Sequence, residues 1–171
     1  KILSRLEFSE PIASDIQTLQ RLYSLWCLHV PFDNLRKMIA LKSEYKQTLP
    51  GLDASDFFEN WIENGCGATC WPMANAFYEL LISIGFDAQR ITGYMRDLGV
   101  INHGSVKVII DGKNYIADAS LLLNQILLLE QDTLIQSDPV FPVEIEKEGE
   151  SHLLWMQTPP GNDFFYCRIL S

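Results

Sequence analysis

The sequence has few of the features that mark disulfide-rich, membrane-spanning or repetitive proteins. It contains four cysteines in 171 residues, too few for a disulfide framework in a chain of this length. No apolar run is long enough to span a bilayer, and no signal peptide is recognisable at the start. There is also no internal repeat and no low-complexity linker. We therefore expect a cytoplasmic protein with reduced thiols and no membrane partner.

Positive charge is also scarce. Lysines and arginines number 13 against 22 aspartates and glutamates, which gives a formal net charge of −9. This balance argues against nucleic acid or an anionic membrane as the main partner, but it leaves small charged ligands open. With 47% apolar residues the chain has enough material for a core, and its length fits one domain or two small ones that share a core.

Metal-binding patterns are weak. Cys66 and Cys70 have a spacing that suggests half of a zinc site, but a structural zinc site uses four such ligands. The sequence has no second close pair of cysteines and no pair of histidines near these two. We therefore expect no bound metal.

The most informative stretch is a glycine-broken loop that leads directly into an amphipathic helix. After residues 65–69, apolar side chains recur at helical spacing, and we expect them to be buried: Met73, Phe77, Leu80, Leu81 and Ile84. Thr69 is the predicted N-cap. Pro72 falls in the first turn, where its missing N–H costs little. The helix is therefore predicted to begin at or beside Cys70.

This position gives Cys70 two interpretations. Unpaired N–H groups and the helix dipole at a helix start stabilise an anion, so a thiol there has a lowered pKa and is a better nucleophile. Position alone is equally compatible with a buried, inert cysteine, because most free cysteines are of that kind. The rest of the sequence decides between the two.

The remaining pattern predicts helices first and an antiparallel sheet after them. Helices are expected over residues 14–28 and over residues 53–64, the latter capped by Asp53 and closed by Gly65. The segment before Pro11 is predicted to be a short strand or tail, and residues 31–50 to be irregular. Strands are expected at residues 88–94, 104–110, 115–120, 140–145, 153–157 and 164–170.

This order indicates an α+β fold. We expect a helical subdomain over residues 1–85, which carries the candidate nucleophile. An antiparallel, barrel-like β subdomain is expected over residues 86–171.

A predicted hairpin brings two polar residues together. Residues 111–112 read Asp-Gly, which is typical of a two-residue turn between antiparallel strands. In that register His103 lies opposite Ser120, and Asp118 is its diagonal neighbour on the same face. A carboxylate that fixes one tautomer of an imidazole completes a nucleophile–base array. Cys70, His103 and Asp118 are therefore a candidate catalytic triad.

Each of these residues also has a purely structural interpretation. His103 is compatible with a polar residue at a strand start, and Asp118 with the cap of a strand end. His29 and His152 have no comparable partner, so we expect them to be structural or exposed. The occurrence of all three candidates in this order and on these elements favours the triad.

Five segments of the chain resemble known cysteine enzymes. Residues 70–81 (CWPMANAFYELL), 84–86 (IGF), 102–104 (NHG) and 115–119 (YIADA) look like the core of the transglutaminase-like, papain-like superfamily. Within it, residues 29–35 (HVPFDNL) are similar to the "vPFeNL" segment of arylamine N-acetyltransferases. In that family a cysteine takes an acetyl group from acetyl-CoA and passes it to an arylamine or hydrazine.

The resemblance implies roles for the candidate residues. Cys70 would be the acylated nucleophile, His103 its base and Asp118 the residue that orients the base. The co-substrate would be acetyl-CoA, the acceptor a small-molecule amine, and no metal would take part. The implied fold is a helical first domain, a β-barrel second domain and a third α/β domain, around a papain-like core.

The chain departs from the family on both sides of Cys70. In front of it the family usually has Arg-Gly-Gly, whereas residues 66–69 of this chain read Cys-Gly-Ala-Thr. Two places after it, Pro72 replaces an acidic or amide residue. The chain also ends soon after the predicted strands, so most of a third domain is expected to be absent. Two alternatives stay open: a transglutaminase-like thiol hydrolase or amide-transfer enzyme, and a non-catalytic binding domain with this fold.

Overall fold

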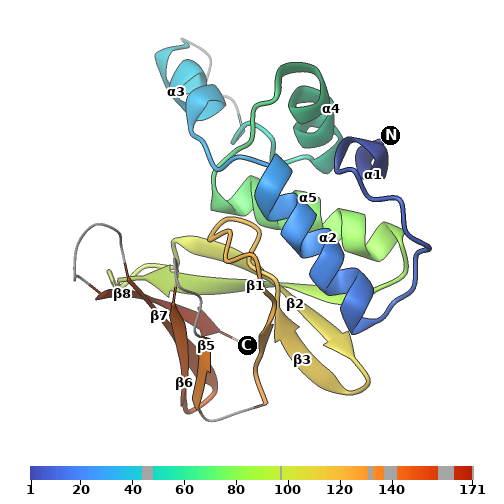
Figure 1. Cartoon of the computed structure of the whole chain (residues 1–171). Coiled ribbons are helices and arrows are strands. Elements are labelled where there is room, and N and C mark those ends of the chain that lie inside the picture. The colour runs from blue at the N-terminus through green and yellow to red at the C-terminus, as the bar shows by residue number, and fades with distance from the viewer. Residues whose placement is uncertain (44–47, 97, 131–132, 137–141, 158–163, 171) are drawn as a thin grey trace.

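In the part of the chain that the computed structural model describes, five helices precede eight strands (Figure 1). The structure describes residues 1–43, 48–96, 98–130, 133–136, 142–157 and 164–170. The helices are α1 (Ile2–Arg5), α2 (Ile16–His29), α3 (Leu35–Lys42), α4 (Ala54–Asn64) and α5 (Cys70–Ser83). The strands are β1 (Asp87–Met95), β2 (His103–Ile110), β3 (Lys113–Ile116), β4 (Leu127–Leu128), β5 (Thr133–Gln136), β6 (Val143–Glu148), β7 (Ser151–Gln157) and β8 (Phe164–Leu170).

Local capping explains where the predicted helices begin and end. In α2 the Asp15 side chain accepts from the Thr18 N–H at 2.8 Å, and in α4 the Asp53 side chain accepts from the Asp56 N–H at 3.0 Å. Gly65 closes α4 in a left-handed conformation, with φ of 70°. These two helices are confirmed, and α5 begins at Cys70 after the predicted N-cap, whose side chain makes no capping hydrogen bond.

Two predictions about the N-terminal half are wrong. Residues 2–5 form the short helix α1 rather than a strand or tail. Residues 35–42, predicted to be irregular, form α3. A helix of four residues is too short to show a period. Helix α3 carries Leu35, Met38 and Ile39 at helical spacing but leaves all three exposed.

The strands form one antiparallel sheet in the order β4-β3-β2-β1-β8-β7-β6-β5. The predicted turn is confirmed, because Ile110 pairs with Lys113 and the two residues between them have φ values of 51° and 72°. The strand expected over residues 115–120 is wrong beyond Ile116, where β3 ends. The strand predicted from residue 140 begins at Val143, and residues 140–141 lie outside the described part of the chain.

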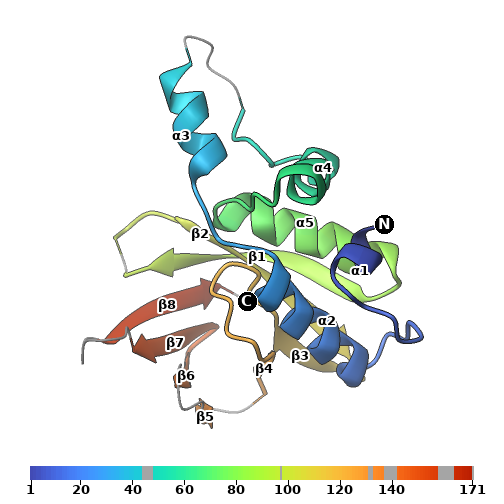
Figure 2. The same cartoon turned by 45° about the horizontal axis from the view of Figure 1, so that its top comes forward.

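Two apolar cores lie on the two faces of the curled sheet. In Figures 1 and 2, α5 runs along β1 and β2, α2 lies beside α5, and α3 stands away from the sheet. The larger core joins α2 and α5 to the sheet around Trp26. The centroid of the Trp26 ring lies 5.8 Å from that of Phe57, on which it stacks, and 4.8 Å from that of Phe77. The smaller core fills the curl of the sheet between β1, β3, β6, β7 and β8. The larger core joins both predicted subdomains, and the division at residue 85 stays a prediction.

Candidate active site

Cys70 is the first residue of α5 and lies next to the start of β2. Its side chain is half-buried, and its Sγ atom is 3.7 Å from the carbonyl oxygen of Asn102. The thiol also interacts with the imidazole of His103, the first residue of β2. The helix start and the strand start therefore meet at this sulfur atom.

His103 and Asp118 form a buried pair. The Nε2 atom of His103 lies 2.6 Å from Oδ2 of Asp118, and the residues are 3% and 1% exposed. Ladder pairing between β2 and β3 ends at Lys107 and Ile116, with one further bond from the Ala117 N–H to the Val106 carbonyl at 3.0 Å. The contact expected from the hairpin register is present although regular pairing stops short of it.

The second carboxylate oxygen of Asp118 is fixed by its own loop. Oδ1 accepts hydrogen bonds from the N–H groups of Ser120 and Leu121 at 3.0 and 2.8 Å, and from the Ser120 hydroxyl at 3.1 Å. Both oxygens are therefore engaged, and the carboxylate can present only one of them to His103.

Helix α2 holds this loop from behind. The Tyr23 hydroxyl donates to the Asp118 carbonyl at 2.7 Å and accepts from the Leu123 N–H at 3.1 Å. The Trp26 indole N–H donates to the Ala119 carbonyl at 2.9 Å. The sequence pattern predicts α2 but assigns these two aromatic residues no polar role. A polar role could be expected from their residue types, since the hydroxyl of a buried Tyr and the indole N–H of a buried Trp usually have a hydrogen-bond partner.

Residues 31–35 dock on the loop in front of Cys70. Phe32 forms a parallel bridge with Ala68, and the Asp33 N–H donates to the Ala68 carbonyl at 3.1 Å. The Asp33 carboxylate accepts from the N–H groups of Gly67 and Leu35 at 2.7 and 3.0 Å. The segment that carries the family resemblance thus fixes the backbone that leads to the thiol.

Removing the Asp33 carboxylate is expected to loosen this loop. In Asp33→Ala the Gly67 N–H loses its acceptor, so we expect unfolding to become easier by about 1 kcal/mol and alkylation of Cys70 to slow about tenfold. The control is Asp53→Ala, which removes a similar carboxylate–N–H bond from the start of α4. Equal alkylation rates in the two variants would show that Asp33 has no effect on the thiol.

The charges of the three side chains stabilise one another. Burial alone raises the pKa of Cys70, but His103 and the N–H groups of Gly104 and Trp71 outweigh it and lower the pKa. Burial also opposes a charged His103, yet Asp118 raises the pKa of its imidazole well above the ordinary value. The same pairing outweighs burial at Asp118 and lowers its pKa to about 2. The arrangement favours a thiolate beside an imidazolium and a carboxylate.

These shifts predict how stability depends on pH. The lowered pKa of Asp118 stabilises the fold above the ordinary value of 3.8, and this contribution is lost as the pH falls towards about 2. The raised pKa of His103 stabilises the fold below its ordinary value of 6.5, and this contribution declines at higher pH. We therefore expect the free energy of unfolding in urea to be largest between these ordinary values. His103→Gln should flatten the profile, and an unchanged profile would contradict the pairing.

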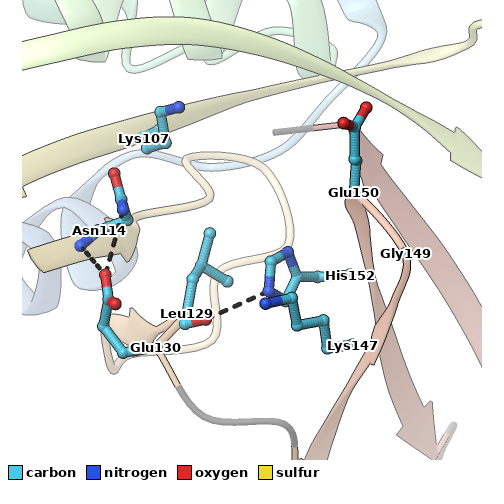
Figure 3. A pocket seen from close by; sticks show the side chains of 8 residues that line it. All are labelled: Lys107, Asn114, Leu129, Glu130, Lys147, Gly149, Glu150 and His152. Carbon is cyan, nitrogen blue, oxygen red and sulfur yellow. Dashed lines mark hydrogen bonds between the residues drawn. The ribbon is translucent and has the colours of Figure 1, made fainter.

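The other two histidines have different surroundings. His29 Nε2 lies 3.8 Å from a carboxylate oxygen of Glu7. His152 is buried, and its Nε2 atom lies 3.2 Å from the Leu129 carbonyl oxygen (Figure 3). It lines a pocket of about 520 Å³ whose other lining residues are Lys107, Asn114, Leu129, Glu130, Lys147, Gly149 and Glu150. None of these eight residues belongs to the Cys70–His103–Asp118 group.

Comparisons with known proteins identify the family. A family model described as N-acetyltransferase matches residues 15–157. The chain belongs to the arylamine N-acetyltransferase family. A similar curated protein, arylamine N-acetyltransferase 2 from Macaca mulatta, is 30% identical over 112 residues, which cover 61% of this chain and 36% of the relative.

Solved arylamine N-acetyltransferases share the fold. The enzyme from Salmonella typhimurium has a TM-score of 0.79 at 21% identity, and the match covers 99% of this chain and 62% of that one. The enzyme from Mycobacterium marinum has a TM-score of 0.81 at 16% identity. That match covers 99% of this chain and 63% of the M. marinum enzyme. These matches confirm the expected α+β class, with helices before a curled antiparallel sheet and the papain-like core of these enzymes.

Further findings bear on function. This family member spans less than two thirds of the two solved enzymes described above, and about a third of the curated relative. A solved Bacillus cereus relative, with a TM-score of 0.74 at 17% identity and coverage of 98% and 67%, is described as having a Cys-His-Glu catalytic triad. Within the described residues, no group of three or more His, Cys, Asp or Glu is placed to hold a metal, and no helix is long and apolar enough to cross a membrane.

Proposed function

We propose that this protein is an acyltransferase that moves an acetyl group from acetyl-CoA to an arylamine or a similar small amine. The observation that carries the proposal is the contact of Cys70, at the start of α5, with the buried His103–Asp118 pair. Family membership supplies the donor and acceptor classes. In this proposal Cys70 is the nucleophile, His103 the acid–base residue and Asp118 the residue that orients it.

The first half-reaction acylates the thiol. The Cys70 thiolate attacks the thioester carbonyl of acetyl-CoA, and the bond between that carbonyl and the CoA sulfur breaks. The His103 imidazolium donates its proton to the departing CoA thiolate. Asp118 keeps the ring in place, since its Oδ2 atom is bound to Nε2. The products are free CoA and an acetyl-Cys70 thioester beside a neutral imidazole.

The second half-reaction transfers the acetyl group. The amine nitrogen attacks the acetyl-Cys70 carbonyl, and neutral His103 accepts one of its protons. The bond to sulfur breaks, and Cys70 leaves as a thiolate beside the restored imidazolium. The amide product departs, and the ion pair is ready for another donor molecule. No metal or redox group is needed at any step.

Two observations favour this proposal over its alternatives. The docked 31–35 segment is the part of the chain that resembles arylamine N-acetyltransferases, and the family model covers it. This argues against a transglutaminase-like hydrolase. A binding domain without activity has no need of a buried carboxylate aligned on an imidazole that contacts a thiol, because each buried charge carries a desolvation cost.

The test is the release of free CoA from acetyl-CoA in the presence of an arylamine or a hydrazine. We expect release to depend on the amine, with parallel double-reciprocal plots that indicate a two-step mechanism. Cys70→Ala should abolish release, whereas Cys66→Ala, which alters the neighbouring thiol, should keep it. Release that needs no amine and yields acetate would support the hydrolase instead.

A further inference from the structure

A second thiol lies against the candidate active site. Cys167, on β8, is fully buried in the smaller core. It pairs with Met95 on β1 and Leu154 on β7, and the other members of this core are apolar side chains. Its thiol nevertheless interacts with the imidazole of His103.

The sheet register explains how the two residues meet. Gly93 on β1 pairs with His103 on one side and with Ile169 on the other, so these three positions share one face of the sheet. Cys167 is two residues from Ile169 and faces the same way. The strand between the ring and the thiol therefore presents a glycine at this position, and the Ile169 side chain extends over it, with Cδ1 3.3 Å from where a Cβ of Gly93 would lie.

The imidazole thus has three ionisable neighbours. Asp118 is bound to Nε2, and the thiols of Cys70 and Cys167 both interact with the ring. The two thiols differ in pKa because their surroundings differ. Burial raises the pKa of Cys167, whereas the pKa of Cys70 is lowered. Only the half-buried thiol at the helix start is set up to lose its proton.

We propose that Cys167 is a positioning residue, whose protonated thiol holds the buried side of the His103 imidazolium so that the ring stays charged and directed at Cys70. This inference rests on the proposed roles of Cys70 and His103. An aliphatic side chain would suit the surrounding core equally well, so packing alone does not account for a thiol here. A cysteine side chain is small and hydrophobic but also carries a weak hydrogen-bonding group. It therefore suits a position between the apolar core and the candidate active site.

The experiment is the pH dependence of Cys70 alkylation by iodoacetamide, followed on the Cys70 peptide by mass spectrometry. In Cys167→Ala the imidazolium loses a partner, so the midpoint for thiolate formation at Cys70 should move up by about half a pH unit. Below that midpoint, alkylation should slow about threefold. Cys167→Ser restores a hydrogen-bonding group and should return the midpoint most of the way.

The matched control is Ile145→Val, which removes a methylene from the same core on β6, two strands away from β8, without altering a polar group. Its midpoint should equal that of the wild type. A folded Cys167→Ala with the wild-type midpoint would overturn the proposal. Should that variant unfold, Cys167→Val makes the same comparison, and unfolding of both would assign Cys167 to core packing. A wild-type Cys70 with an ordinary thiol midpoint would instead reject the proposed function.

Discussion

Replacing Asp118 by asparagine is expected to slow acylation of Cys70 by about 10⁴-fold. The amide carries no charge to stabilise the imidazolium, and its NH₂ group does not accept the Nε2–H that Oδ2 now receives at 2.6 Å. His103 would turn to the wrong tautomer and leave the thiol protonated. The measurement is the single-turnover rate of acetyl transfer from acetyl-CoA to the protein.

The matched control for this prediction is Ser120→Ala. It removes one hydroxyl contact to Oδ1 of Asp118 but keeps both backbone N–H bonds and the carboxylate itself. We expect a loss below about tenfold, because one neutral hydrogen bond contributes about 1 kcal/mol. If both variants slowed acylation equally, the charge of Asp118 would not be what matters.

Gly67→Ala is expected to disrupt the approach to the nucleophile. A Cβ atom at Gly67 would overlap with the carbonyl oxygen of Pro31, so the two docked segments would have to separate. This would break the Phe32–Ala68 bridge and the bond from the Gly67 N–H to Asp33. We expect a loss of about 3 kcal/mol in stability and a fall in acylation of about 100-fold or more.

Gly99→Ala is the control for the substitution itself. A Cβ at Gly99 would meet no atom within 4 Å, although its φ of 74° makes alanine somewhat strained. That strain costs about 1 kcal/mol, and we expect no change in acylation. Thermal unfolding and the single-turnover rate, measured on both variants, separate stability from organisation of the site. A Gly67→Ala variant as active as Gly99→Ala would contradict the docking account.

Local signals account for most of what the sequence predicted about the fold. Helix caps and tight turns depend only on residues close in sequence. Helix α4, capped by Asp53 and Gly65, and the Asp-Gly turn at residues 111–112 could therefore be predicted. Helix α3 is harder to predict, because it spans only eight residues and none of its apolar stripe of Leu35, Met38 and Ile39 is buried. The end of β3 at Ile116 depends on the loop that follows it, which is held by contacts from α2.

The same distinction applies to the candidate site. Strand alternation and a two-residue turn were enough to place His103 and Asp118 on one face. The sequence could not show that Tyr23 fixes the Asp118 loop, since the two residues are 95 positions apart. Nor could it show that Asp33 binds Gly67 or that Cys167 reaches His103, because both contacts depend on tertiary packing.

The structure also accounts for the departures from the family around Cys70. Gly67 keeps the close approach to Pro31 that the docked segment needs, and Pro72 lies in the first turn of α5 without a lost hydrogen bond. The Asp33 carboxylate binds backbone N–H groups directly. The loop is therefore held without the arginine that is usual in the family.

The central claim is that Cys70 accepts an acyl group from a CoA thioester. The most direct test is the intact mass of the protein after brief incubation with acetyl-CoA, for the wild type, Cys70→Ala and Cys66→Ala. We expect the mass of one acetyl group on the wild type and on Cys66→Ala, and none on Cys70→Ala. An acetyl group that persists in Cys70→Ala, or a wild type that gains none while its Cys70 thiol alkylates rapidly at neutral pH, would contradict the claim.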